Sequence, residues 1–191
     1  MAGEINEEKR SGGIGRSEPL RIAATVALVA LWAANLAVDH STVQTVLGFV
    51  LIGVLVQVTV SDLEERRIKN RVIFPAAIAA ILIGLVLHPT GVPAQLVAGA
   101  AAGVFLTIFA LASRGLGMGD AKLGLVLGLY LSHNVLLALL VGLCASALFS
   151  IGVMVRRGVS AGRKTWIPLG PFLALGGVVA VLAGPSLHLA T

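Results

Sequence analysis

The stretch VIFPAAIAAILIGLVLHPTGVPAQLVAGAAAGVFLTIFALAS, residues 72–113, contains no charged side chain. A helix of about 20 apolar residues crosses the hydrocarbon core of a bilayer, so this stretch is long enough for two crossings. Near its middle, His88-Pro-Thr-Gly-Val-Pro93 combines proline and glycine, which favour a turn over a helix. The stretch therefore predicts a membrane-spanning helical hairpin, with spans near 72–88 and 94–113.

The same pattern extends outward from this hairpin in both directions. Four more uncharged stretches occur, and Ser132-His-Asn134 divides the longest of them. The chain is 57% hydrophobic and only 12% charged, with a mean hydropathy of +0.97, which excludes a water-soluble globular enzyme. We predict an all-α polytopic membrane bundle of about seven transmembrane helices, the other five near 21–38, 42–60, 117–132, 134–155 and 167–188.

The basic residues predict the orientation of these spans. Alternating sides from a cytoplasmic N-terminus brings all 14 Lys and Arg residues to one side, in the tail and in the loops 61–71, 114–122 and 156–164. The opposite side carries Asp39 and all four histidines. The positive-inside rule then predicts a cytoplasmic N-terminus and an outside C-terminus. Because the basic residues are dispersed among short loops, nucleic-acid binding is not expected.

The histidines and the single cysteine are the candidate metal ligands. His40, His88, His133 and His188 share the outer side, and they are either an external metal site or polar residues that mark helix ends. No HxxxH spacing is present, which favours the second interpretation. Cys144 lies inside an apolar run and, being alone, excludes an intramolecular disulfide and a cysteine-based zinc site. We expect neither a metal nor a cofactor.

Two acidic residues stand apart from the other seven, which lie where water reaches them easily. Asp62 follows the apolar run 54–60, at the predicted end of a span. Asp120 follows glycines 115, 117 and 119, and the apolar segment after it ends at Leu131, after only about 17 Å of helix. Because the hydrocarbon core is about 30 Å thick, the spanning element must begin before Asp120. Ionisable groups at such depth usually face a protein interior or a water-filled cavity.

One helical hairpin separates Asp62 from Asp120, so both carboxylates are predicted at the same membrane face. Two adjacent carboxylates cannot both ionise easily, so one holds a proton while the other acts as a base. Such a pair can activate water and polarise a carbonyl, which is the chemistry of peptide hydrolysis. Lys122 either favours an ionised partner or is an interfacial anchor. Gly99 to Gly103 and Gly124 to Gly128 are small-residue faces that permit close helix packing.

Three passages together carry a family resemblance: residues 61–75, the GxGD motif in Gly117-Met-Gly-Asp-Ala-Lys-Leu123, and residues 167–176, which include a Pro-x-Gly-Pro-Phe motif. Over residues 43–190 the sequence resembles the type IV prepilin peptidase family of GxGD aspartic membrane proteases. The resemblance implies an aspartic endopeptidase that removes the short basic leader of prepilins or pseudopilins at the cytoplasmic membrane face. It implies Asp62 and Asp120 as the catalytic pair, with Gly117 and Gly119 shaping the backbone beside Asp120.

The composition of the first 20 residues, which are polar and rich in Gly and Ser, and the extent of the resemblance together predict a domain organisation. We expect a disordered tail over 1–20, an additional N-terminal transmembrane helix over 21–41, and a six-helix prepilin peptidase-like domain over 42–191. The first span is interpreted as uncleaved, the alternative being a signal peptide. Longer family members carry a cysteine-rich, zinc-binding region and also N-methylate the new terminus. Here residues 39–41 alone separate the first two spans, which predicts a short peptidase without methyltransferase activity.

The sequence permits alternative interpretations of two acidic residues and of the function. Glu64 and Glu65 either attract basic residues of a leader or form a self-neutralising loop with neighbouring arginines. A small proton-coupled transporter is an alternative function, since intramembrane aspartates serve as proton relays, although no internal repeat is visible. A catalytically silent pilus-assembly factor with the same fold is another alternative. The lipid bilayer and a prepilin substrate are the expected partners.

Overall fold

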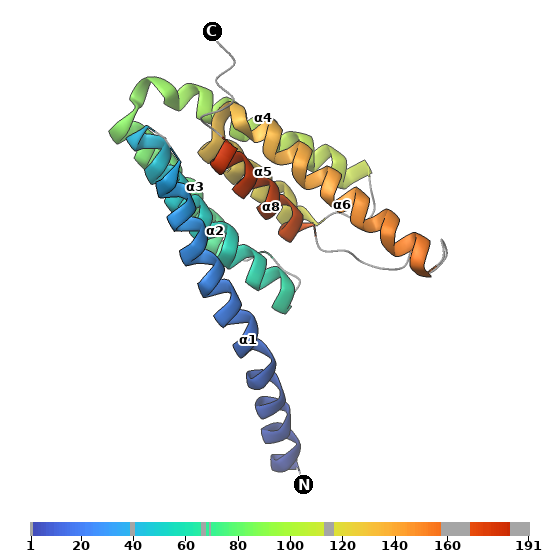
Figure 1. Cartoon of the computed structure of the whole chain (residues 1–191). Coiled ribbons are helices and arrows are strands. Elements are labelled where there is room, and N and C mark those ends of the chain that lie inside the picture. Colours follow the sequence, from blue (N-terminus) through green and yellow to red (C-terminus); the bar gives the residue numbers. More distant parts are fainter. Residues whose placement is uncertain are drawn as a thin grey trace.

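The computed structural model describes residues 2–38, 41–65, 68, 70–112, 117–157 and 169–183, with the side chains of 2–18, 65 and 157 not described. Throughout these residues the chain forms helices and no strand (Figure 1). The all-α membrane bundle is therefore confirmed. The elements are α1 (Ala2–Ala37), α2 (Thr42–Glu65), α3 (Asn70–Leu87), the 3-10 helix η1 (Pro89–Gly91), α4 (Val92–Ala112), α5 (Met118–Leu131), the 3-10 helix η2 (Ser132–Asn134), α6 (Val135–Arg157) and α8 (Gly170–Ala183).

Both predicted turns inside the long apolar stretches are confirmed. η1 falls within the proline- and glycine-containing segment, and η2 coincides with Ser132-His-Asn134. Ser132 adopts a φ of 49°, a left-handed conformation that reverses the chain after α5. The described residues contain five apolar stretches long enough to cross a membrane, the last of which runs through α5, η2 and α6, and α8 is a shorter apolar helix. The count of seven crossings stays a prediction.

The N-terminal tail differs from the sequence prediction. Disorder was expected over 1–20, whereas α1 is helical from Ala2 onward. Glutamate, lysine and arginine at positions 7–10 are good helix formers, and a helix that already exists in the first span extends at one hydrogen bond per added residue. The apolar part of α1 begins at Pro19, close to the predicted start of the first span.

α2 begins where its sequence provides a cap. The backbone N–H of Ser41 donates to Gln44 Oε1 at 3.2 Å, and the Ser41 hydroxyl accepts from the backbone N–H of Gln44 at 3.4 Å. This reciprocal pair satisfies two backbone N–H groups at the helix start. At its other end α2 carries Asp62, so its start and its end define the two ends of the bundle.

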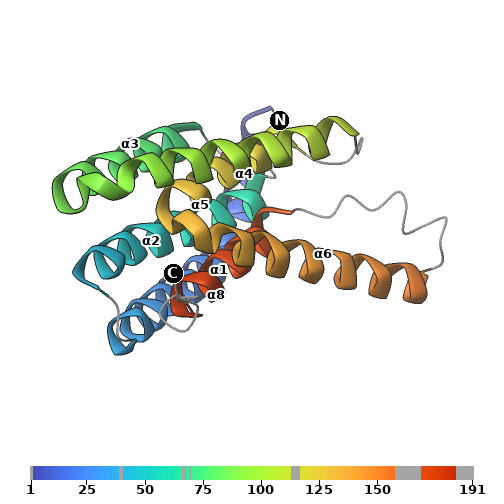
Figure 2. The same ribbon diagram turned by 90° about the horizontal axis from the view of Figure 1, so that it is seen from above.

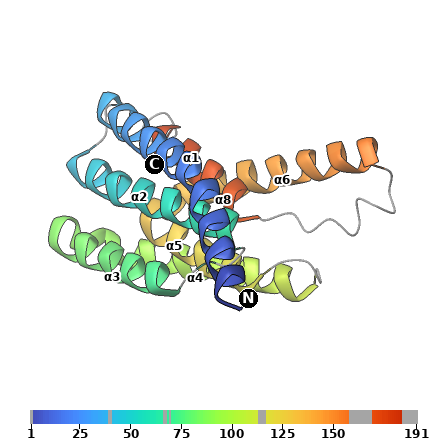
Figure 3. The same ribbon diagram turned by 90° about the horizontal axis from the view of Figure 1, so that it is seen from below.

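α5 lies at the centre of the bundle. It packs closely against α4, and it also contacts α2, α3 and α8. Figure 2 shows it between the α3–α4 pair on one side and α2 with α8 on the other. α6 packs along α8, and α1 lies at the periphery, next to α2 and α8 (Figure 3). We call the end of the bundle where α2 finishes and α5 and α8 begin the aspartate end.

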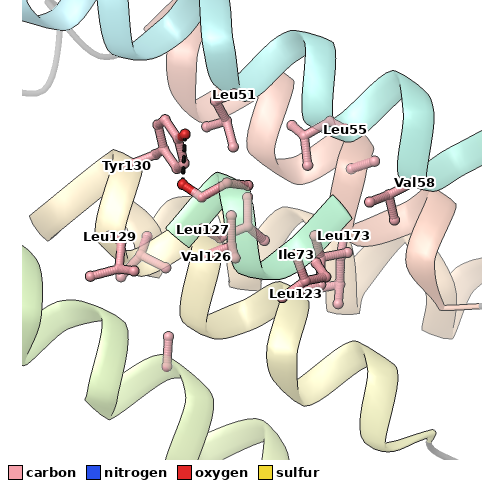
Figure 4. Close-up of a cluster of buried hydrophobic side chains, with 14 of the residues drawn as sticks. Leu51, Leu55, Val58, Ile73, Leu123, Val126, Leu127, Leu129, Tyr130 and Leu173 are labelled. Carbon is pink, nitrogen blue, oxygen red and sulfur yellow. Dashed lines mark hydrogen bonds between the residues drawn. The ribbon is translucent and has the colours of Figure 1, made fainter. Parts of the chain in front are cut away.

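The core is built around the buried faces of α2, α5 and α8 (Figure 4). Leu51, Leu55, Leu127 and Leu173 are almost completely buried within it. The Tyr130 hydroxyl donates to the carbonyl oxygen of Ala76 at 2.8 Å, which connects α5 to α3. A buried hydroxyl that lacked this partner would be costly, and the bond therefore fixes how these two helices pack.

Small residues allow the close approach of α4 and α5, as the sequence predicted. A Cβ added at Gly99 would lie 2.9 Å from Leu129 Cγ, and one added at Gly103 would lie 3.1 Å from Leu125 Cβ. A Cβ added at Gly128 would collide with the Ala98 carbonyl oxygen and lie 2.5 Å from Gly99 Cα. These helices thus pack backbone against backbone, as small residues permit in membrane bundles.

We expect Gly128→Ala to destabilise the bundle by about 1–3 kcal/mol, because the added methyl group must separate α4 from α5. The matched control is Gly152→Ala on α6, where an added Cβ meets nothing within 4 Å. That substitution should leave stability unchanged or raise it by up to about 1 kcal/mol, since alanine favours a helix over glycine. Thermal unfolding of both variants in detergent measures the difference, and equal melting temperatures would contradict the packing described.

Large apolar side chains cover the outside of the bundle. Val86 is 78% exposed and Val155 is 80% exposed, and many Leu, Ile and Phe side chains on the outer faces are more than half exposed. A surface of this kind would aggregate in water, whereas a bilayer solvates it as well as a protein core does. The chain is therefore a multi-pass membrane protein.

Candidate active site

Asp62 continues the buried face of α2. Leu51, Leu55, Val58 and Asp62 recur at helical spacing and all face the bundle interior, whereas Leu63 is 49% exposed. Asp62 itself is only 7% exposed. The periodicity that buries the leucines therefore also directs this carboxylate inward.

Asp120 lies in the first turn of α5 and is 8% exposed. Its Oδ2 accepts a hydrogen bond from the backbone N–H of Gly117 at 3.2 Å. In return, the backbone N–H of Asp120 donates to the Gly117 carbonyl oxygen at 3.1 Å. The carboxylate thus caps its own helix, which fixes the position of the side chain.

Both buried carboxylates lie at the aspartate end, Asp62 near the end of α2 and Asp120 in the first turn of α5. Asp62 and Asp120 are close enough to interact electrostatically. The Asp62 carboxylate lies against Gly170, at the start of α8. Its Oδ2 is buried and has no hydrogen-bond partner within the described part of the chain. A helix N-terminus favours negative charge, so the starts of α5 and α8 each face one carboxylate with a positive helix end.

Gly117 and Gly119 occupy different environments beside Asp120. Gly117 is the residue before α5, and a Cβ there would lie 3.7 Å from Asp120 Oδ2, an ordinary contact. A Cβ at Gly119 would lie 3.1 Å from Ile68 Cβ. Gly119 thus gives Ile68, which follows α2, room to pack against the first turn of α5.

Two neighbouring charged side chains, Glu64 and Lys122, have partners other than the two aspartates. Glu64 accepts from Arg21 Nε at 3.4 Å, an ion pair between α2 and α1. Lys122 donates to Asn70 Oδ1 at 2.9 Å, connecting α5 to the start of α3. Glu65 is the last residue of α2, and its side chain is outside the described part.

Gly170 is a site residue to which the sequence gave no role. A Cβ at this position would lie 2.5 Å from Asp62 Oδ2 and 3.1 Å from Asp62 Cγ. No side chain therefore fits there without displacing the carboxylate. The signal was present in the Pro-x-Gly-Pro-Phe motif, which places a glycine at the start of the last helix.

The opposite end of the bundle holds two of the histidines. His88 and His133 line the same cavity, of about 450 Å³, together with Gln95 and Tyr130. His40 and His188 lie outside the described residues. Among the described residues, no group of three or more His, Cys, Asp and Glu side chains could hold a metal ion.

A comparison of the sequence with models of protein families identifies the family of the chain. The sequence model of the type IV leader peptidase family matches residues 49–153, more than half of the chain, and the match includes Asp62 and Asp120. The chain belongs to this family.

The curated leader peptidases that this chain resembles are longer than the part that it matches. It is 31% identical over 154 residues to a prepilin leader peptidase/N-methyltransferase from Aeromonas salmonicida, covering 75% of the chain and 51% of the relative. A relative of the same description from Aeromonas hydrophila is 30% identical over 152 residues. The chain therefore spans about half the length of the curated leader peptidases that it matches. No solved structure matches it.

Proposed function

We propose that the chain is a membrane-embedded aspartic endopeptidase that cleaves the short basic leader from type IV prepilins or pseudopilins. The observation that carries this proposal is the pair of buried, electrostatically interacting carboxylates, Asp62 and Asp120. Membership of the leader peptidase family supports the reaction class.

The chemistry follows from a pair that shares one proton. The ionised carboxylate accepts a proton from water as the water oxygen attacks the scissile carbonyl carbon. The protonated carboxyl donates its proton to the carbonyl oxygen. When the tetrahedral intermediate collapses and the C–N bond breaks, the carboxyl that took the water proton donates it to the leaving nitrogen. The other carboxylate takes a proton from a hydroxyl of the intermediate, which restores the starting pair. The pair titrates as a unit, so the two roles belong to the dyad rather than to one fixed residue.

The proposed location is the cytoplasmic face of the inner membrane. The basic residues at the aspartate end support it, because positive residues accumulate on the cytoplasmic side. A reporter enzyme fused after Thr191 is then expected to be active outside the cytoplasm. Cytoplasmic activity of the reporter would contradict this orientation.

Co-expression with a prepilin tests the activity. Leader removal is followed by gel mobility, and the mature product is analysed by mass spectrometry. We expect removal of the basic leader and a new N-terminus without a methyl group, because we propose peptidase activity alone. A prepilin that keeps its leader would overturn the proposed function, and a methylated product would overturn the restriction to peptidase activity.

We further propose that Glu64 attracts a basic residue of the leader and that Arg21 competes for it within the chain. Glu64→Gln should then raise the KM for prepilin by about two- to fivefold, because the attracting charge is lost. Arg21→Gln should lower the KM by a similar factor, because the competing cation is lost. A two- to fivefold change corresponds to about 0.4–1 kcal/mol, which lies within the range of an exposed ion pair. A purely structural ion pair predicts changes in the same direction for both variants, and that result would exclude the competition.

A further inference from the structure

Lys122 forms a long-range hydrogen bond beside the aspartates. It follows Asp120 closely in α5, and its Nζ donates to Asn70 Oδ1 at 2.9 Å. Asn70 is the first residue of α3, and the two bonded residues are 52 positions apart in the chain. Because the donor is ionised, a bond of this kind is stronger than one between neutral groups. The bond therefore attaches the start of α3 to α5.

A second contact attaches the same part of the chain to α5. Ile68, which is partly buried and comes shortly before Asn70, packs against Gly119, where an added Cβ would lie 3.1 Å from Ile68 Cβ. Gly119 and Lys122 are three residues apart, so they lie on the same face of α5. The chain that leads from α2 into α3 is therefore held against one face of α5 at two points, Ile68 and Asn70.

These two contacts connect the surroundings of the two aspartates. Asp62 lies in the last turn of α2, shortly before Ile68, and Asp120 lies between Gly119 and Lys122 in α5. α2 packs more extensively against α8 and α3 than it does against α5. The position of Asp62 relative to Asp120 therefore depends on the chain that follows α2 as well as on the core.

We propose that Lys122 and Asn70 are positioning residues, which hold Asp62 and Asp120 at the separation that the reaction needs. This inference rests on the proposed function. Among the described residues, Lys122 forms no hydrogen bond with either aspartate, and its Nζ bonds to Asn70 instead. The pair therefore acts on the geometry of the dyad rather than as a third reacting group.

The kinetics of prepilin processing test this pair. Lys122→Met keeps the apolar stem of the side chain but loses the donor, and Asn70→Leu keeps the shape of the side chain but loses the acceptor. Because misplacing a reacting group by about 1 Å can cost about 10²-fold in rate, we expect each variant to lower kcat by about 5- to 50-fold and to leave KM unchanged. Asn70→Asp, which retains the acceptor oxygen, should process prepilin at a nearly normal rate.

The double variant, Lys122→Met with Asn70→Leu, distinguishes a bonded pair from two independent residues. We expect it to lose little more activity than either single variant, since both single variants break the same bond. Losses that multiply would overturn the pairing. A raised KM with an unchanged kcat would overturn the positioning role and indicate that Lys122 binds the substrate.

Arg71→Met is the matched control. Arg71 is the exposed neighbour of Asn70, and it forms no ion pair with a residue that the structure describes. Its replacement removes a positive charge from the same end of the bundle without touching the bond, so kcat should stay normal. A loss equal to that of Lys122→Met would show that the charge matters and the bond does not, which would overturn the inference.

Crosslinking reports the geometry of the dyad without any prepilin. The full chain carries Cys144→Ala, to remove its own thiol, together with Asp62→Cys and Asp120→Cys. A short bifunctional thiol reagent then joins the two new cysteines within one chain at a rate that depends on their separation. We expect Lys122→Met to lose most of this crosslink and Arg71→Met to retain it. Equal crosslinking in all three chains would overturn the inference.

The positioning role and the proposed function can fail separately. If the unmodified chain leaves prepilin uncleaved while the crosslink still depends on Lys122, the peptidase activity is disproved and the positioning of the two residues stands. If the unmodified chain cleaves prepilin while Lys122→Met changes neither kcat nor the crosslink, the positioning role alone is disproved.

Discussion

Asp62→Asn and Asp120→Asn are each expected to reduce prepilin processing by about 10²- to 10⁴-fold, the range expected for loss of a general acid or base. Asparagine retains the shape of the side chain but can neither accept the proton of water nor donate one to the carbonyl. Because the two residues act as a unit, the double variant should lose little more than either single variant. Initial rates of leader removal, compared at equal amounts of enzyme in the membrane, measure the effect.

The stability of these variants separates catalysis from folding. Asp62 Oδ2 is buried without a hydrogen-bond partner in the described part of the chain, so neutralising this side chain should not lower the melting temperature. Loss of activity with retained stability identifies a functional group rather than a structural one. Asp39→Asn, between the first two spans, is the matched control and should process prepilin normally. Full processing by Asp62→Asn or Asp120→Asn would disprove the dyad.

Gly170→Ala is expected to reduce processing by about 10- to 100-fold although it changes no reacting group. The new methyl group would lie 2.5 Å from Asp62 Oδ2, so the carboxylate must move away from the start of α8. Misplacing a reacting group by about 1 Å can cost about 10²-fold in rate. Single-turnover rates of processing, with a melting curve for each variant, measure the effect.

Gly152→Ala is the control for Gly170→Ala, since its new Cβ would meet nothing within 4 Å. It should process prepilin at the normal rate. If Gly170→Ala did the same, the contact between α8 and Asp62 would have no part in the reaction. A lower melting temperature together with a slow rate would instead indicate a role of Gly170 in folding.

Turn chemistry and charge allowed much of the fold to be predicted from the sequence. Proline and glycine at 89–91 and the polar residues at 132–134 interrupt apolar runs, and both interruptions are turns in the structure. Asp62 and Asp120 could be singled out because charged residues are rare in this chain. Their burial together at one end of the bundle agrees with the single hairpin that separates them.

Contacts between helices could not be predicted in the same way. A helix that is apolar on every side gives no indication of which face meets the bundle, and α5 is apolar nearly all round. The contact of Gly170 with Asp62 and the bond from Lys122 to Asn70 depend on such rotations. The same holds for the Arg21–Glu64 pair, which joins residues 43 positions apart.

The shortness of α5 has a consequence for how the protein is made. Its 14 residues span about 21 Å, less than the hydrocarbon core, and its first turn carries Asp120. Such a segment is a poor candidate for entering a bilayer alone, but with α6 it forms one continuous apolar unit of 39 residues. We therefore expect this unit to insert first, and Asp62 and Asp120 to come together only after α5 has packed among its neighbours.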